Sequence, residues 1–181
     1  KFCIHPKELV KDVEIIGGTK NLNIEKIKAL KPDLIIANKE ENVKEQVEEL
    51  MKDFKVLVTN VETLEDNYYL IKQFGHLFGK EEKAQFLNIK TYEVFDIPKR
   101  EKKLKVAYLI WKDPYMTVGG DTFISRILEE LGFENQFKNQ KRYPEIQLED
   151  FKEADLIFLS TEPFPFKEKH ITEIQNICVN Q

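Results

Sequence analysis

A short repeat that occurs twice is the feature that most constrains the fold of this chain. Residues 24–38 read IEKIKALKPDLIIAN, and residues 148–160 read LEDFKEADLIFLS. In both copies an apolar residue precedes a glutamate, a short amphipathic turn follows, and Asp-Leu-Ile opens an apolar run. The two glutamates, Glu25 and Glu149, lie 124 residues apart. A repeat that recurs once at this distance predicts two similar lobes and argues against a solenoid, which repeats every few dozen residues.

Helical and apolar stretches alternate through the first half of the chain. Residues 34–37 and 56–59 are short, continuous apolar runs, typical of parallel strands that are covered on both faces. Residues 40–53 and 63–78 carry apolar side chains at helical spacing. Asn23 is the expected N-cap of a further helix that Pro32 ends. This β-α-β-α order predicts a parallel sheet with right-handed crossovers.

Residues 80–96 break this alternation, because they form one uninterrupted helical pattern with no strand directly after it. Pro98 and the basic run 99–105 close the pattern. We interpret the segment as a helix that joins two lobes, with an ordinary crossover helix in one continuous sheet as the alternative. The predicted organisation is an N-terminal α/β lobe over residues 1–79, a bridging helix over 80–98 and a C-terminal α/β lobe over 99–181.

The second half opens with the longest and most apolar predicted strand, residues 104–111. A glycine-containing loop follows, and Asp121 is the expected N-cap of a helix over 122–131 that Gly132 ends. A strand over 155–160 and a helix from residue 167 onward complete the pattern. The predicted fold class is therefore α/β: two Rossmann-like lobes with parallel sheets, joined by one long backbone helix.

Composition excludes several classes of function. The net charge of −4 argues against a nucleic-acid-binding protein, which needs a basic face. Cys3 and Cys178 form neither a disulfide framework nor a CxxC metal site. No apolar run reaches the roughly 18 residues that span a bilayer, and no signal-peptide pattern is present. The G-x-G-x-x-G, P-loop, G-x-S-x-G and H-E-x-x-H signatures of common enzymes are absent as well, so we expect a protein that is not an enzyme.

Candidate ligand contacts follow the predicted strands, because ligands of parallel sheets bind beyond the carboxyl ends of the strands. Polar Asn38 follows the first strand, whereas the later strands are followed by aromatic residues and a methionine: Trp111, Tyr115, Met116, Phe164 and Phe166. Such side chains line small-molecule pockets. The alternative is that these loop aromatics fold onto the core. His5 and Cys3, in the loop before the sheet, are the candidate metal ligands.

Four stretches together resemble a known family: GGTKNLNIEKIKALKPDLIIAN, YLIWKDPYMTVGGDTFISRILEELGFEN, YPEIQLEDF and STEPFPF. They are similar to substrate-binding proteins of ABC importers, of the helical-backbone type that includes cobalamin-, haem- and siderophore-binding proteins. The resemblance covers essentially the whole chain. It implies two α/β lobes bridged by one long helix, with the ligand in the cleft between them. It also implies a strand–helix segment before residue 1 and further elements after the last helix.

The resemblance also implies roles for individual residues. In this family one glutamate from each lobe meets arginines of the importer's membrane permease subunits, and the matching positions are Glu25 and Glu149. The ligand-binding positions that carry over are Phe2, Thr19, Asn38, Trp111, Met116 and Tyr143; Tyr115 and Phe164 join them from the strand-end argument. Thr19 and Asn38 are polar where cobalamin binders carry aromatic residues, which leaves ferric siderophores and other metal chelates open beside cobalamin.

The predicted function is that of a monomeric, periplasmic or cell-envelope protein that captures a corrinoid, a ferric siderophore or haem for an ABC importer. The ligand is the metal chelate itself, and no intrinsic cofactor is expected. One alternative is a cytoplasmic metal-chelate sensor of the same fold. Another is a two-lobed α/β metalloenzyme that uses Cys3, His5 or Glu162.

Overall fold

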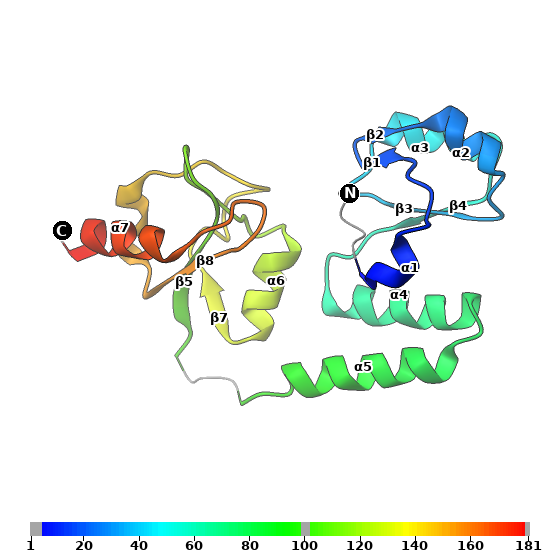
Figure 1. Ribbon diagram of the computed structural model, residues 1–181. Helices are drawn as coiled ribbons and strands as arrows, with labels where there is room; N and C mark the ends of the chain where they lie inside the picture. Colours follow the sequence, from blue (N-terminus) through cyan, green and yellow to red (C-terminus); the bar gives the residue numbers. More distant parts are fainter. Residues whose placement is uncertain (1–4, 99–101, 180–181) are drawn as a thin grey trace. The chain divides into compact units, whose positions relative to one another are not determined.

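The computed structural model describes residues 5–98 and 102–179, without the side chains of residues 148, 152 and 176–179 (Figure 1). Its contacts divide the chain into a first unit, Lys1–Asn60, and a second unit, Val61–Gln181. The first unit contains α1 (Lys7–Val10), β1 (Gly17–Gly18), β2 (Asn21–Leu22), α2 (Ile24–Leu30), β3 (Ile35–Asn38), α3 (Lys44–Met51) and β4 (Val56–Thr59).

The first copy of the repeat forms α2 and β3 in the first unit. Helix α2 begins where the Asn23 side chain accepts a hydrogen bond from the Lys26 N–H at 3.0 Å, as predicted. It ends at Lys31, which adopts a left-handed conformation directly before Pro32. Strands β3 and β4 pair in parallel, with Asn38 level with Thr59 at their carboxyl ends. The expected parallel β-α-β arrangement is therefore present.

The second unit contains α4 (Leu64–Leu77), α5 (Glu81–Phe95), β5 (Leu104–Trp111), β6 (Met116–Thr117), α6 (Phe123–Glu130), β7 (Phe133–Asn135), the 3₁₀ helix η1 (Leu148–Glu153), β8 (Leu156–Leu159) and α7 (Glu168–Val179). Strand β5 is the centre of a four-stranded sheet. Its residue Leu109 pairs with β8 on one edge and with β6 on the other. Strand β6 is antiparallel, because only a short loop separates it from β5 and a parallel return needs a longer crossover.

The core of the second unit lies on both faces of β5. Val106, Ala107 and Leu109 are fully buried in this strand. Aromatic side chains from the later loops and from η1 complete one cluster, in which Phe137, Phe151 and Phe166 are buried. Burial on both faces explains why the strand reads as a continuous apolar run instead of an alternating one.

The predicted N-cap of α6 is wrong by one residue. The side chain of Thr122, and not that of Asp121, accepts the hydrogen bond from the Ser125 N–H, at 3.2 Å. Asp121 instead accepts a hydrogen bond from the Arg142 N–H at 2.6 Å, which holds a distant loop beside the helix. Gly132 follows the end of the helix with a φ of 78°, as expected of a glycine there.

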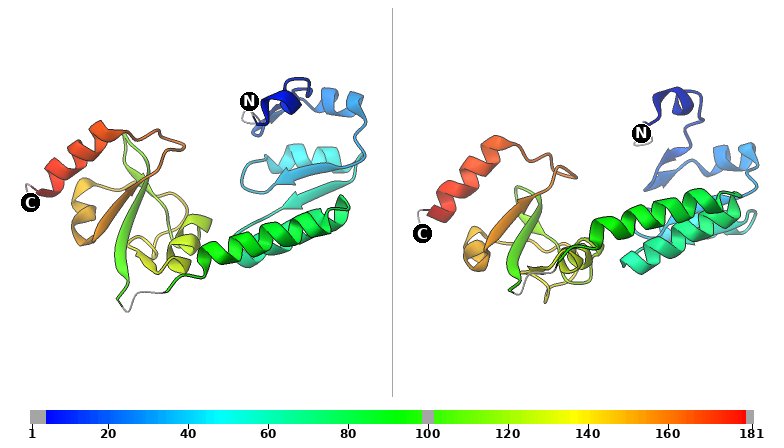
Figure 2. Two further views of the ribbon diagram at one scale, coloured as in Figure 1. Left: turned by 60° about the horizontal axis from the view of Figure 1, so that its bottom comes forward. Right: turned by 90° about the horizontal axis from the view of Figure 1, so that it is seen from below.

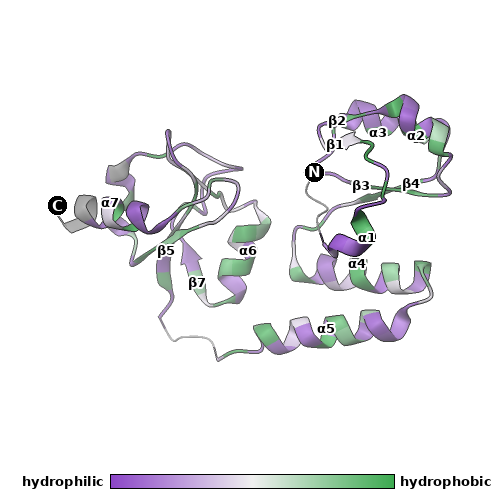
Figure 3. Cartoon of the chain, in the orientation of Figure 1, coloured by the Kyte–Doolittle hydropathy of each residue, from purple (hydrophilic) through white to green (hydrophobic). Residues whose placement is uncertain are grey.

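Helices α4 and α5 form a hairpin in the second unit and lie side by side (Figure 1 and Figure 2). The hairpin closes tightly, because a Cβ atom on Gly75 would lie 2.5 Å from that of Ala84. Tyr68 stacks on Tyr92 with the ring centroids 4.3 Å apart. Apolar and polar residues alternate along both helices (Figure 3). The uninterrupted pattern does form one continuous helix, α5, whereas its role as a bridge and the lobe boundaries at 79 and 98 stay predictions.

Candidate ligand-binding site

Asn38 builds the turn that follows β3. Its side-chain oxygen accepts hydrogen bonds from the N–H groups of Glu40 and Glu41, at 2.9 and 3.1 Å. Its side-chain nitrogen donates to the hydroxyl of Thr59 at the end of the neighbouring strand, at 3.3 Å. The predicted contact residue thus fixes the backbone at the carboxyl edge of the sheet, where that backbone can present polar groups to a ligand.

A residue that sequence reasoning missed, Asn42, brings the predicted contacts of the first unit together. Its side-chain nitrogen donates to the carbonyl oxygen of Thr19 at 3.0 Å, and its side-chain oxygen accepts from the Asn38 N–H at 2.8 Å. The sequence around Asn42 indicates this role only weakly, because an asparagine before a helix is common in turns for purely local reasons. Thr19 and Asn38 therefore lie at one loop cluster, as the predicted site requires.

In the second unit an aromatic wall forms at the carboxyl ends of β5 and β8; we define it by Trp111, Met116, Tyr143 and Phe164. Trp111 lies level with Met116 in the β5–β6 pairing. Its ring meets that of Phe164 edge-on, with centroids 5.7 Å apart. Trp111 is 39% exposed, so a large aromatic surface at this edge faces outward.

Tyr143 reaches the same wall along a different segment. Pro144, the next residue, accepts a hydrogen bond from the Thr117 N–H at 3.0 Å, so this segment runs beside β6. Met116 forms a bridge with Glu145 in the same segment. The guanidinium of Arg142 lies 5.3 Å from the centre of the Tyr143 ring, and the tyrosine is 40% exposed. The Tyr143 ring therefore has a guanidinium beside it.

Two other candidates turn towards the core. Tyr115 packs edge-on against Phe151, with ring centroids 5.8 Å apart, and its hydroxyl lies 3.3 Å from a carboxylate oxygen of Glu173. Phe166 is buried in the core cluster. The alternative, aromatic loop residues folded onto the core, describes these two side chains and in part Phe164, which also packs against the core cluster. Ligand contact by Tyr115 and by Phe164 stays a prediction.

An ion pair joins Lys112, the residue that follows β5, to Glu173 of α7. The ammonium of Lys112 lies 2.6 and 2.5 Å from the two carboxylate oxygens of Glu173. This hydrogen bond raises the pKa of Lys112 and lowers the pKa of Glu173. The Lys112 side chain is only 17% exposed, which screens the pair less than an open surface would.

His170 supports the loop that carries Phe164. Its Nδ1 accepts a hydrogen bond from the Lys167 N–H at 2.8 Å, so this nitrogen is unprotonated. The imidazole packs against Phe164 and Phe166, with centroids 5.4 and 5.6 Å away. Burial lowers the pKa of His170, and the neutral imidazole is therefore the form that holds the loop.

The predicted docking glutamates occupy equivalent places in the two units. Glu25 lies in the first turn of α2, and Glu149 lies in the first turn of η1. Both are exposed. Their role in docking stays a prediction.

The candidate metal ligands do not form a site in the part of the chain that is described. Phe2 and Cys3 lie outside the described residues, and the side chain of Cys178 is not described either. His5 and Glu162 are both exposed. Among the described residues no three His, Cys, Asp or Glu side chains are placed to hold a metal ion. Within the same residues no helix has the length and apolar character of a membrane span.

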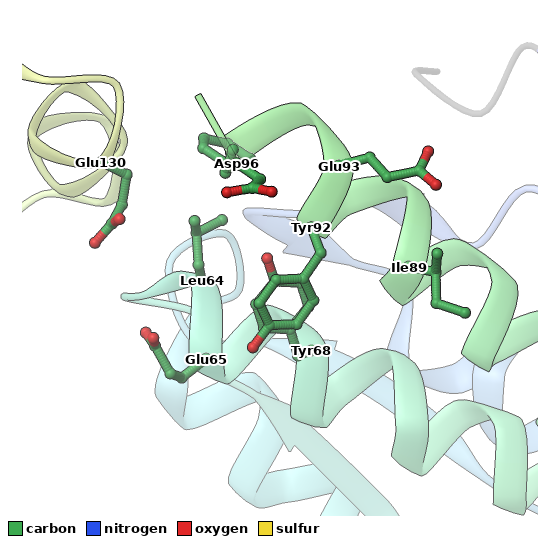
Figure 4. Close-up of a pocket in the computed structure, with 9 residues that line it drawn as sticks. Leu64, Glu65, Tyr68, Ile89, Tyr92, Glu93, Asp96 and Glu130 are labelled. Atoms are coloured by element: carbon green, nitrogen blue, oxygen red, sulfur yellow. The ribbon is translucent and has the colours of Figure 1, made fainter. Parts of the chain in front are cut away.

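A pocket of about 610 Å³ lies between the α4–α5 hairpin and α6, away from every predicted contact (Figure 4). It is lined by Leu64, Glu65, Tyr68, Ile89, Tyr92, Glu93, Phe95, Asp96 and Glu130. Burial raises the pKa of Tyr68, and Tyr92 and the nearby glutamates act in the same direction. The pocket draws on three helices, so no local sequence pattern indicates it.

The sequence as a whole matches a known protein family. The model of the periplasmic binding protein family matches residues 5–176. The chain belongs to the periplasmic binding protein family. This family consists of binding proteins, in agreement with the expectation that the chain is not an enzyme.

Curated relatives of this periplasmic binding protein share about a quarter of its residues. It is 28% identical to a vitamin B12-binding protein of Vibrio vulnificus (strain CMCP6), over 84% of the chain and 59% of the relative. It is 30% identical to an ABC transporter substrate-binding lipoprotein of Bacillus subtilis (strain 168), over 75% of the chain and 46% of the relative. An Fe(3+)-citrate-binding protein of the same strain is 26% identical, over 82% of the chain and 50% of the relative. The chain thus spans about half to three fifths of the length of these relatives.

A solved structure shows the same fold. The periplasmic vitamin B12-binding protein of Vibrio cholerae matches with a TM-score of 0.76 and 22% identity, over 97% of this chain and 71% of that one. At this level of identity the likeness shows the fold alone, and it confirms the predicted α/β class.

Proposed function

We propose that this periplasmic binding protein is the substrate-binding component of an ABC importer and captures a metal-containing small molecule. The observation that carries the proposal is the aromatic wall, in which large rings are exposed at the carboxyl edge of a buried sheet. Exposed aromatic faces at such an edge suit a flat, conjugated ligand. The names of the matched relatives, which bind vitamin B12 or Fe(3+)-citrate, support a metal chelate as the ligand.

The polar loops of the first unit add oxygen-rich chelates to the flat ligands that the aromatic wall suits. Thr19 and Asn38 occupy positions where cobalamin binders are expected to carry aromatic rings, and hydrogen-bonding groups there suit the oxygen-rich rim of a chelate. The candidates are therefore a ferric siderophore or ferric citrate, haem and a corrinoid. We place the protein at the cell envelope, as its matched relatives' names indicate, with the metal chelate as its ligand.

A titration of the chain, and of a version extended by the residues that flank it in its gene, with ferric citrate, a panel of ferric siderophores, haemin and cyanocobalamin tests this proposal. At least one probe is expected to bind with a Kd of about 1 μM or tighter in isothermal titration calorimetry. Trp111→Ala is expected to weaken that binding about tenfold, which corresponds to about 1.4 kcal/mol, because the ligand loses a stacking surface.

Tyr69→Ala is the matched control for this substitution. Tyr69 is an aromatic residue of the same unit and is 63% exposed on α4, away from the wall. Its loss is expected to leave the Kd within a factor of about two. The proposal fails if no probe binds either version of the protein, and the wall is misassigned if both alanine variants bind equally well.

We infer docking on the importer's permease subunits through Glu25 and Glu149. Reversing both charges, Glu25→Lys with Glu149→Lys, is expected to weaken binding to the reconstituted permease at least tenfold, about 1.4 kcal/mol. The physical reason is that each new lysine would repel the permease cation that the wild-type carboxylate attracts. Ligand affinity is expected to stay unchanged.

A second double variant controls for charge alone. Glu45 and Glu168 are also exposed first-turn glutamates, in α3 and α7. Glu45→Lys with Glu168→Lys therefore makes the same change of net charge in the same two units. If this pair weakens permease binding as much as the first, or if the first pair weakens ligand binding instead, the docking assignment is refuted.

A further inference from the structure

One half-buried side chain joins the two loops of the first unit that carry predicted ligand contacts. The β1–β2 turn contains Thr19, and the β3–α3 turn begins at Asn38. Asn42 lies between them and bonds to the backbone of both, donating to the Thr19 carbonyl at 3.0 Å and accepting from the Asn38 N–H at 2.8 Å. The two bonds connect segments that are about twenty residues apart in the sequence.

The chemistry of this link is specific to an amide. Asn42 uses one acceptor and one donor of the same planar group, so the two loops are held at a fixed separation. An aspartate keeps the acceptor for Asn38 but has no donor for the Thr19 carbonyl, and an alanine has neither. The two turns are also linked by Thr19 to Glu41, at 3.5 Å, and by Lys20 to the Glu40 carbonyl, at 2.6 Å. Both of these contacts are made by exposed side chains.

We propose that Asn42 is a positioning residue for ligand capture. It holds Thr19 and Asn38 in one arrangement before the ligand arrives, so the ligand does not have to order the β1–β2 turn on binding. Ordering a loop on binding weakens affinity, and a link that fixes it beforehand strengthens affinity without any new contact to the ligand. The inference rests on the proposed function, because that function makes Thr19 and Asn38 ligand contacts.

The test compares Asn42→Asp and Asn42→Ala with the wild type, in whichever version of the protein binds, using whichever of ferric citrate, the ferric siderophores, haemin or cyanocobalamin binds in the calorimeter. Asn42→Asp is expected to weaken binding about fivefold and Asn42→Ala about tenfold, the size of losing one or two hydrogen bonds that order the site. The titrations are made at low temperature, where circular dichroism shows each variant to be folded. A purely structural role leaves the Kd of the folded variants unchanged.

Gln46→Ala is the matched control. The side chain of Gln46 accepts a hydrogen bond from the Leu22 N–H at 3.1 Å, so it also ties the β1–β2 hairpin to the α3 region. It contacts neither Thr19 nor Asn38 in the bonds described. Its loss is expected to lower the melting temperature about as much as Asn42→Ala and to leave the Kd within a factor of about two.

Amide hydrogen exchange gives a readout without any ligand. In Asn42→Asp the Asn38 amide is expected to stay protected while the β1–β2 turn exchanges faster; in Asn42→Ala both exchange faster. Absence of binding by both the wild-type chain and its extended version refutes the proposed function, and hydrogen exchange alone then tests the link. Unchanged exchange in both variants overturns the link, and faster exchange with an unchanged Kd overturns the positioning role.

Discussion

Replacing Asn135 by alanine is expected to lower the free energy of unfolding of the second unit by about 4 kcal/mol. Asn135 ends β7 and is 1% exposed. Its side-chain nitrogen donates to the Val118 carbonyl at 2.9 Å and to the Ser125 hydroxyl at 3.0 Å. Its side-chain oxygen accepts from the Phe137 N–H at 3.0 Å. One amide thus joins the residue that follows β6, helix α6 and the loop after β7.

The size of this effect follows from the groups left behind. Alanine removes three hydrogen bonds, and the buried Val118 carbonyl and Phe137 N–H then lack these partners, each at a cost of about 1–3 kcal/mol. Urea unfolding followed by tryptophan fluorescence measures the change. Trp111 is the only tryptophan of the chain and lies in the second unit, so its emission reports that unit.

Ser125→Ala is the control for this prediction. It removes one of the three bonds, and the Asn135 nitrogen keeps its bond to the Val118 carbonyl. A loss of about 1 kcal/mol is expected. A loss below about 1 kcal/mol for Asn135→Ala would show that the buried amide does not hold these elements together.

The parts of the fold that follow from sequence are those with long, regular patterns. The apolar run 104–111 forms β5 with the predicted bounds, and the uninterrupted pattern over 80–96 forms α5. The antiparallel strand Met116–Thr117 escapes prediction, because two residues have no periodicity. The predicted N-cap of α6 is misplaced because Asp121 and Thr122 are both good caps, and the distant Arg142 N–H decides between them.

The candidate site likewise has residues that the sequence locates and residues that it misses. The rule for strand ends locates Trp111 and Phe164, since it depends only on where parallel strands stop. It does not separate Trp111 from Tyr115, because both follow from the end of β5 and the residue that draws Tyr115 to the core, Phe151, is distant in the sequence. Asn42 is missed because both of its bonds reach backbone atoms, which carry no mark in the sequence.

Gly120→Ala is expected to lower the free energy of unfolding of the second unit by about 3 kcal/mol, the upper end for forcing atoms into a packed site. A Cβ atom at this position would lie 2.0 Å from the carbonyl oxygen of Lys138, a backbone atom that cannot rotate away. The Gly120 N–H also donates to the Gln140 carbonyl at 2.9 Å, so the loop is fixed from both sides. Urea unfolding monitored through Trp111 measures the loss.

Gly79→Ala is the control that separates the effect of steric overlap from the effect of a left-handed backbone conformation. Gly79 has a φ of 60°, but a methyl group at this position would meet no atom within 4 Å, whereas Gly120 has the overlap without a left-handed φ. The left-handed conformation costs an alanine about 1–2 kcal/mol, so Gly79→Ala is expected to be the milder change. The loop that Gly120 supports leads directly into Tyr143 of the aromatic wall, and the Gly120 variant is therefore also expected to change the Trp111 emission of the folded state. Equal losses in the two variants, with unchanged emission, would mean that the loop moves aside freely and that the wall does not depend on it.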